Sequence, residues 1–121
     1  MKPDLAEAQA ALGVALCARH ALDEGIGHLQ KAVAIEPGYA AAHQDLGEAY
    51  ASQGRFELAS THYLRALEQR PDDVTLLNRA AWILATASDA GVRNGTRALA
   101  FAERAARLTR RQIRVGLKFT F

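Results

Sequence analysis

Apolar residues recur along the chain with the period of an α-helix, and the whole pattern repeats after 34 residues. The stretch from Leu12 to Pro37 lies over the stretch from Leu46 to Pro71 when the sequence is shifted against itself. The matching pairs are Leu12 and Leu46, Gly13 and Gly47, Leu16 and Tyr50, Leu22 and Phe56, Leu29 and Tyr63, Ala32 and Ala66, and Pro37 and Pro71. A period of this length indicates a repeat architecture.

Each unit reads as two helices joined by a turn. Leu46 and Tyr50 share one helical face, and the letters SQGR around Gly54 interrupt that helix. A second apolar stripe at helical spacing follows, made of Phe56, Ala59, Tyr63, Ala66 and Leu67. The prolines at positions 37 and 71 end the second helix of each unit, because proline cannot continue the hydrogen-bond ladder. Each unit is therefore a helical hairpin.

Gly47 lies inside the first helix of its hairpin, where glycine costs about 1 kcal/mol relative to alanine. We expect this cost to be accepted because the two antiparallel helices approach closely at that point. A residue without a Cβ atom, faced by Ala59 and Ala66, permits that approach.

A third unit begins on schedule but is longer than the others. Leu77, Ala80, Ala81 and Leu84 fall 34 residues after the equivalent positions of the second unit, whereas its second helix aligns only at a shift of 39. This difference places five extra residues in the turn SDAGVRNG. The predicted fold is all-α, with three hairpins and six helices over residues 1–110.

The last residues, 111–121, change period. In RQIRVGLKFTF the apolar residues alternate with polar residues or glycine, which predicts an extended, strand-like tail with one apolar face. Besides Ile113, the residues of that face are Val115, Leu117, Phe119 and Phe121. The tail either covers the open end of the last hairpin, pairs with a copy of itself in a dimer, or is foreign to the repeat array.

Composition agrees with packed helices. The chain has 121 residues, enough for one domain, and its apolar half includes 26 alanines but only eight aromatic residues. Cys17 is the single cysteine, so an intrachain disulfide and a multi-cysteine zinc site are excluded. The start MKPDLAEAQ lacks the apolar core of a signal peptide, and no apolar run reaches the length of a membrane span. These features predict a soluble, cytoplasmic protein.

The spacing Leu-Gly-x-x-Tyr at 46–50, followed by Gly54, Ala59, Tyr63, Ala66 and Pro71, resembles the tetratricopeptide repeat. Residues 6–39, 40–73 and 74–110 are the three units of this resemblance. The third is similar to the terminal repeat of many bacterial proteins of this type, which indicates a bacterial source. The letters RVGLKFTF also resemble the closing strand of outer-membrane β-barrels, although the other strands of a barrel are absent.

The resemblance implies a right-handed superhelix whose first helices line a concave groove for peptides or partner helices. The larger predicted groove residues are Gln44, Glu48, Asn78 and Trp82, and the first repeat contributes Val14 and Cys17. Trp82 has two open interpretations, because it either anchors a partner or packs between the second and third hairpins. Ala10 and Val14 replace the polar side chains that hold a C-terminal carboxylate in some relatives, so that ligand is not expected.

Charge is unevenly distributed along the chain. Residues 1–89 carry a formal charge of −5, whereas residues 90–121 carry +7. The predicted basic patch consists of Arg104, Arg107, Arg110, Arg111 and Arg114. Such a patch contacts an anion or forms a solvated helix face, and its few aromatic neighbours argue against nucleic-acid recognition. Opposite charges on the two segments also favour head-to-tail self-association.

Candidate catalytic groups do not form a supporting constellation. His43 and His62 are the only histidines expected to approach each other across a hairpin, and no other ligands complete a metal site. Cys17 has His20 nearby but no implied oxyanion donors, and a phosphate-binding loop is absent. We therefore expect no enzymatic activity, no cofactor and no metal.

Three functions remain open from the sequence. The first is a non-enzymatic scaffold that binds a peptide or helix of another protein in its groove. The second is a self-assembling module that oligomerises through the C-terminal end and tail. The third, an anion-binding or nucleic-acid-binding module, relies on the arginines alone.

Overall fold

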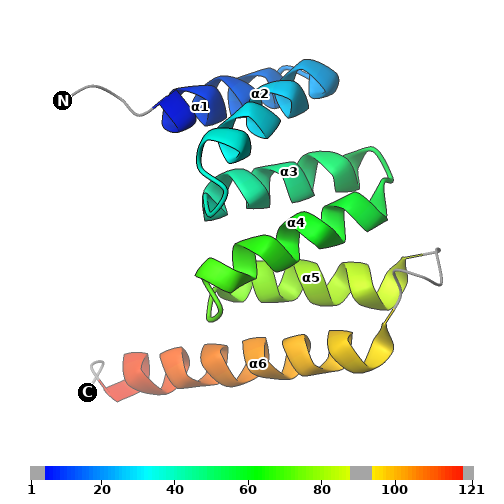
Figure 1. Ribbon diagram of the computed structural model, residues 1–121. Coiled ribbons are helices and arrows are strands. Elements are labelled where there is room, and N and C mark those ends of the chain that lie inside the picture. Colours follow the sequence, from blue (N-terminus) through cyan, green and yellow to red (C-terminus); the bar gives the residue numbers. More distant parts are fainter. Residues whose placement is uncertain (1–4, 88–93, 119–121) are drawn as a thin grey trace.

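Six helices stack in pairs along one direction in the computed structural model, which describes residues 5–87 and 94–118 (Figure 1). They are α1 (Leu5–Ala18), α2 (Leu22–Ile35), α3 (Ala40–Ser52), α4 (Phe56–Gln69), α5 (Val74–Thr86) and α6 (Gly95–Lys118). The two helices of each pair contact each other more extensively than they contact the next pair. No strand occurs in these ranges. The predicted all-α solenoid of three hairpins is confirmed.

The connections between paired helices follow the predicted spacing. Three residues join α1 to α2 and α3 to α4, whereas eight positions separate α5 from α6. The five extra residues therefore lie in the third turn, as expected. His20 and Gly54, which are equivalent in the repeat, both adopt left-handed backbone angles, with φ of 66° and 75°. A left-handed residue after a helix ends it and directs the chain into the next one.

Side chains cap the two helices of the third hairpin. The Leu76 amide donates to Oδ1 of Asp73 at 3.1 Å, which satisfies a free amide in the first turn of α5. The Arg97 amide donates in the same way to Oδ1 of Asn94 at the start of α6, at 3.0 Å. Pro37 and Pro71 lie just beyond α2 and α4, as their effect on the helix ladder requires.

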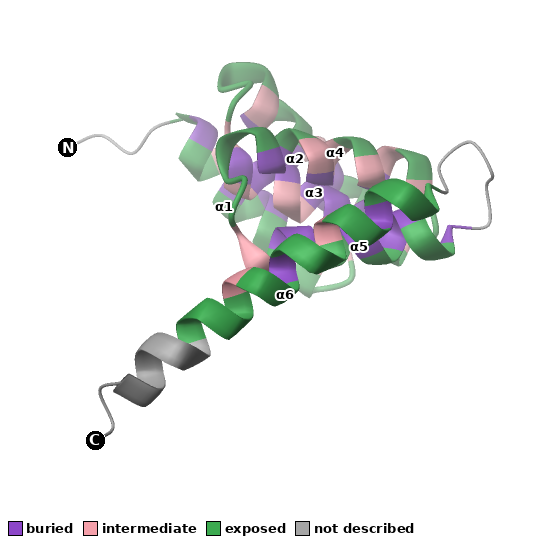
Figure 2. Cartoon of the chain, turned by 90° about the horizontal axis from the view of Figure 1, so that it is seen from below, coloured by how far each residue is buried: buried purple, intermediate pink, exposed green. Residues whose placement is uncertain are grey.

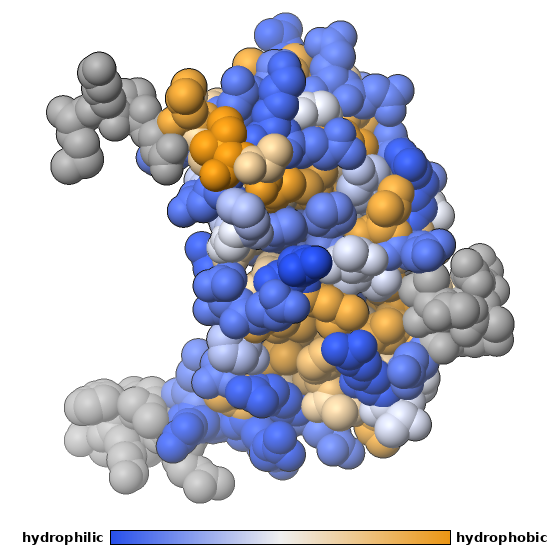
Figure 3. Space-filling model, in the orientation of Figure 1, coloured by the Kyte–Doolittle hydropathy of each residue, from blue (hydrophilic) through white to orange (hydrophobic). Residues whose placement is uncertain are grey.

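Position along the stack decides how deeply equivalent residues are buried. Leu46 of α3 is fully buried at 0% exposure, whereas its repeat equivalent Leu12 of α1 is 46% exposed. The reason is that α2 covers α3, while no described helix precedes α1. Figure 3 accordingly shows apolar residues gathered at the surface over the start of α1. In Figure 2 the buried residues form a continuous interior between the helices.

Gly47 packs against an aromatic ring, which corrects the expectation that it faces alanines. A Cβ atom built on Gly47 would lie 2.7 Å from Cε1 of Tyr63, a residue of α4. The backbone approach that we expected there occurs in the first hairpin instead. A Cβ atom on Gly13 would lie 2.8 Å from the carbonyl oxygen of Gly25, and the reverse substitution meets the Gly13 carbonyl at the same distance. Gly25, whose equivalent in the second repeat is Ala59, thus permits a closer helix pair.

The prediction of an extended tail is wrong for residues 111–118, because α6 continues through them to Lys118. Once a helix is nucleated, each further residue gains a hydrogen bond, whereas a lone strand has no partner for its backbone. Among the predicted tail residues, Val115 and Leu117 lie in this helical segment, where side chains are not described. Phe119 and Phe121 lie outside the described residues.

Candidate binding groove

Two hollows lie between successive hairpins along the first helices. The first hollow has a volume of about 290 Å³ and lies between α1, α2 and α3. It is lined by Val14, Cys17, Ala18, Leu22, Leu29, Asp45, Glu48, Ala49 and Ser52. The second hollow, of about 370 Å³, lies between α3, α4 and α5. Its lining residues are Ala51, Tyr63, Asn78, Arg79, Trp82 and Ile83.

Five of the six predicted groove residues line these hollows. Val14, Cys17 and Glu48 line the first hollow, and Asn78 and Trp82 line the second. Gln44 does not line either hollow but contacts Glu48, as described below. The predicted set is therefore brought together along the first helices of the three hairpins.

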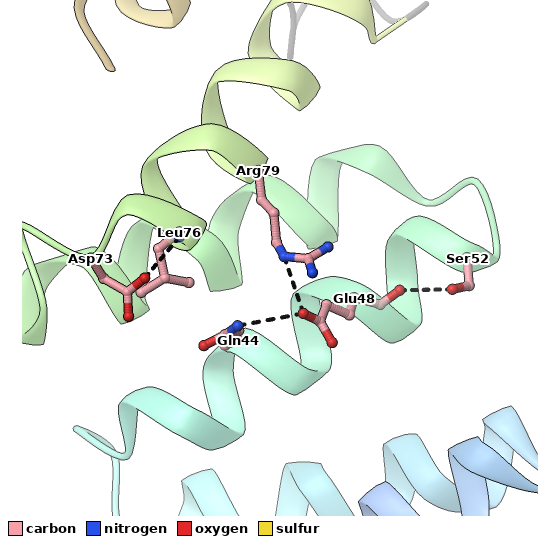
Figure 4. Close-up of polar contacts among 6 residues, drawn as sticks. All are labelled: Gln44, Glu48, Ser52, Asp73, Leu76 and Arg79. Atoms are coloured by element: carbon pink, nitrogen blue, oxygen red, sulfur yellow. Dashed lines mark hydrogen bonds and ion pairs between the residues drawn. The ribbon is translucent and has the colours of Figure 1, made fainter. Parts of the chain in front are cut away.

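An ion pair connects the two hollows (Figure 4). Nε of Arg79, on α5, lies 3.2 Å from Oε1 of Glu48, on α3. Gln44 lies one turn before Glu48 and donates a long hydrogen bond of 3.4 Å to the same carboxylate oxygen. Both partners of the ion pair are partly exposed, so it contributes little to stability. The ion pair instead holds one charged side chain in place at the border of each hollow.

Asp45 gives the first hollow a second carboxylate. Burial, together with the negative charge of Glu48, raises the pKa of Asp45 to about 6. Burial and the charge of Asp45 also raise the pKa of the Cys17 thiol. Among the residues that the structure describes, no basic one lines this hollow. Its interior is therefore apolar with a negative edge, and its thiol is less ionised than a free cysteine.

Trp82 is the largest exposed apolar side chain of the second hollow. It is 56% exposed, and its ring meets the ring of Phe56 edge-on at a centroid distance of 6.0 Å. Trp82 thus packs in part between the second and third hairpins, and more than half of its surface is exposed. Tyr63 forms the floor of the hollow, and burial raises its pKa to about 12.

His43 and His62 approach each other, as the sequence predicted. Their Nδ1 atoms are 2.9 Å apart and their rings are stacked, with Tyr50 stacked on His62 as a third ring. Neither histidine lines a hollow. Over residues 5–87 and 94–118 no group of three or more His, Cys, Asp or Glu side chains is placed to hold a metal ion.

A third hollow carries part of the predicted basic patch. It has a volume of about 410 Å³ and is lined by Asp72, Arg104, Arg107, Leu108 and Arg111. Arg104 forms an ion pair with Asp72, which neutralises one of the three arginines. Arg110 is exposed outside this hollow, and the side chain of Arg114 lies outside the described residues. Since its arginines are exposed on a helix surface, the hollow is open to solvent.

The sequence analysis missed Asp45 and Arg79, which supply charge to the two hollows. These residues are 34 positions apart and therefore equivalent in the repeat. A usable signal was present, because each lies one residue after a predicted groove position, Gln44 or Asn78. Neighbouring positions on a helix are about 100° apart, so both can border a concave surface.

Among the described helices none combines the length and the apolar character needed to cross a membrane. The candidate site is thus a surface of a helical stack. Its chemical features are shape, one exposed aromatic ring, and charges of opposite sign on neighbouring helices.

Comparison with known sequences identifies the repeat. The family model described as tetratricopeptide repeat matches residues 16–83, which is more than half of the chain. A relative from Arabidopsis thaliana, the tetratricopeptide repeat domain-containing protein PYG7, chloroplastic, is 36% identical over 70 residues. The match covers 58% of this chain and 23% of that protein.

Solved structures agree on the fold. One crystal structure of MamA superimposes with a TM-score of 0.77 at 24% identity, covering 90% of this chain and 61% of that one. A second MamA crystal structure gives a TM-score of 0.76 at the same identity, covering 90% and 57%. The chain thus spans less than two-thirds of the length of each of these proteins.

Proposed function

The chain belongs to the tetratricopeptide repeat family, and from that premise we propose that it binds a peptide or helix of a partner protein in the groove formed by the first and second hollows. Repeats of this family generally mediate protein–protein interaction. The activity we propose is non-enzymatic and uses no cofactor.

The observation that carries this proposal is the continuity of the two hollows. They border the same helix, α3, and meet at the ion pair of Glu48 with Arg79. An extended segment or a helix laid across α1, α3 and α5 would contact both. Trp82 would supply the aromatic anchor, since exposed tryptophans contribute strongly to binding energy.

The test is partner capture by single variants. Trp82→Ala and Asn78→Ala should weaken retention of partners from a lysate of the source organism, as measured by affinity pulldown with quantitative mass spectrometry. Leu99→Ala is the matched control. The exposed fraction of Leu99, 59%, is similar to the 56% of Trp82, but Leu99 lines neither hollow. Circular dichroism should show equal helicity for all three variants. Partners that are retained equally by Trp82→Ala, Asn78→Ala and Leu99→Ala would contradict binding in the groove.

Self-assembly is the second candidate function, and the exposed end of the stack favours it. Leu12 on α1 exposes apolar surface that its equivalent Leu46 on α3 buries, and Leu5 at the start of α1 is also exposed. Residues 1–89 and 90–121 carry opposite net charge. Light scattering on the full chain and on a chain truncated after Thr109 tests this candidate. An oligomer that dissociates on truncation supports assembly through the C-terminal end, whereas a monomer in both cases removes it.

A further inference from the structure

We propose that the first hollow binds a basic side chain, lysine or arginine, of the partner segment. This inference rests on the proposed groove function and specifies the chemistry of one anchor position. The occupant is a segment of another protein that places one cation beside Asp45 and the aliphatic stem of the same side chain against the apolar walls.

The walls of the first hollow suit such a stem. Val14 and Leu22 come from the first hairpin, and Ala49 comes from α3 on the opposite side. Lysine and arginine bury their methylene groups along apolar surface while the charged group reaches a polar partner. A hollow of about 290 Å³ with apolar walls and an acidic edge provides both environments.

Asp45 is available to a ligand because its carboxylate makes no hydrogen bond or ion pair with the part of the chain that the structure describes. Glu48, in contrast, already pairs with Arg79. The raised pKa of Asp45 shows that its charged form lacks compensation, since burial and Glu48 both disfavour it. A cation in the hollow would remove that penalty, whereas a neutral or anionic side chain would leave it in place.

The second hollow suits a side chain of a different type, at a neighbouring position of the partner segment. Arg79, the one charged residue among the described residues that line it, is paired with Glu48, and its exposed ring is Trp82. An apolar or aromatic side chain fits that surface. The expected partner segment therefore places a basic residue over α1 and α3 and an apolar residue over α3 and α5.

Cys17 makes occupancy of the first hollow measurable. It is the single cysteine of the chain and lines this hollow, so its alkylation reports on one place only. The probes are Nα-acetyl-lysine methylamide and Nα-acetyl-norleucine methylamide, which share the aliphatic stem and differ in the ammonium group. The measurement is the rate of Cys17 alkylation by iodoacetamide at pH 7, followed by intact-protein mass spectrometry with each probe at up to 20 mM.

We expect the lysine probe to slow alkylation at least twofold and the norleucine probe to leave the rate unchanged. In Asp45→Asn the lysine probe should lose its effect. The effect is judged by the ratio of the rates with and without probe, because the substitution itself changes the Cys17 pKa and therefore the rate without probe. A Glu24→Gln variant is the control for loss of a carboxylate on a helix surface away from the hollow, and it should keep the protection.

Equal protection by both probes, or protection by neither, would overturn the assignment of a basic side chain. That result is separate from failure of the proposed function, because the groove test depends on Trp82 and Asn78 in the second hollow. Alkylation that slows as the protein concentration rises, without any probe, would show that a second copy of this chain fills the hollow. That outcome would overturn the assignment to another protein.

Discussion

The Nδ1 atoms of His43 and His62 lie 2.9 Å apart and join the two helices of the second hairpin. Nε2 of His43 lies 2.7 Å from the carbonyl oxygen of Pro37, and this nitrogen must carry the proton because a carbonyl only accepts. The network then assigns Nδ1 of neutral His43 as the acceptor and Nδ1–H of His62 as the donor. The two rings thereby connect α3 and α4 to the residue that ends α2.

Acid should destabilise the protein through His62. Burial, and then the electrostatic interactions with His43 and with Arg65, lower the pKa of His62 from 6.5 to about 4. The unfolded chain therefore binds a proton at His62 more readily than the folded chain does. The contribution of neutral His62 to the free energy of unfolding is fully present above pH 6.5 and is lost as pH falls toward 4. After allowance for solvent screening of a half-buried ring, we expect a loss of roughly 1 to 2 kcal/mol in the free energy of unfolding.

The measurement is urea unfolding at pH 7 and pH 4.5 in wild type and His62→Gln. The glutamine variant should lose less stability between these two pH values than wild type. His28→Gln provides a control, because His28 pairs with Gln9 in the first hairpin and lies outside this network. A pH dependence that is identical in wild type and His62→Gln would contradict the role of His62.

Asp45 should act with the opposite sign. Its pKa is raised from 3.8 to about 6, so the folded state binds its proton more tightly than the unfolded state. Stability from this group is present below pH 3.8 and is lost as pH rises through 6. Removing the charge with Asp45→Asn should therefore stabilise the domain at pH 7, by about 1 kcal/mol once screening of the half-exposed side chain is included.

Thermal and urea unfolding of Asp45→Asn at pH 7 and pH 4.5 tests this expectation. The gain in stability should be larger at pH 7, where the wild-type carboxylate is charged. A variant that is less stable than wild type at pH 7 would show that Asp45 has a stabilising partner, and it would also remove the argument for a vacant cation position.

The sequence was sufficient to predict the fold because the same apolar pattern occurs in more than one repeat, and each copy independently predicts the same pair of helices. Leu46, Tyr63 and Ala66 lie on two helical stripes, and their equivalents recur 34 residues earlier. Each stripe predicts a buried face, and the structure buries all three residues. The C-terminal tail was mispredicted because its apolar residues alternate with polar residues or glycine over a stretch too short to outweigh continuation of α6.

The groove was predictable only in outline. The resemblance to the tetratricopeptide repeat identified the surface that holds Asn78 and Trp82, but it did not indicate which charged residues are paired. The pairing of Glu48 with Arg79 joins residues 31 positions apart on different helices. Such a contact depends on the angle between hairpins, which a packing pattern shared by a whole family does not encode.

Two glycines within helices should respond oppositely to alanine. A Cβ atom on Gly47 would lie 2.7 Å from the Tyr63 ring, so Gly47→Ala must displace a buried aromatic side chain. We expect a loss of about 1 to 3 kcal/mol in stability. Gly27 of α2 has no atom within 4 Å of such a Cβ atom, so Gly27→Ala should stabilise by about 0.5 to 1 kcal/mol through helix propensity. Urea unfolding of both variants measures the difference, and equal effects would contradict the packing at Gly47.

Leu12 and Leu46 offer the most direct test of the stacking order, because they are the same residue type at the same repeat position. Leu46 is fully buried beneath α2, and Leu46→Ala should cost about 2 to 5 kcal/mol through lost burial and the cavity left behind. Leu12 is 46% exposed on α1, and Leu12→Ala should cost less than about 1 kcal/mol in the monomer. The midpoint of urea unfolding measures both at a concentration where light scattering shows a monomer. A large cost at Leu12 under these conditions would show that its outer surface is covered within the chain, contrary to the observed order of the helices.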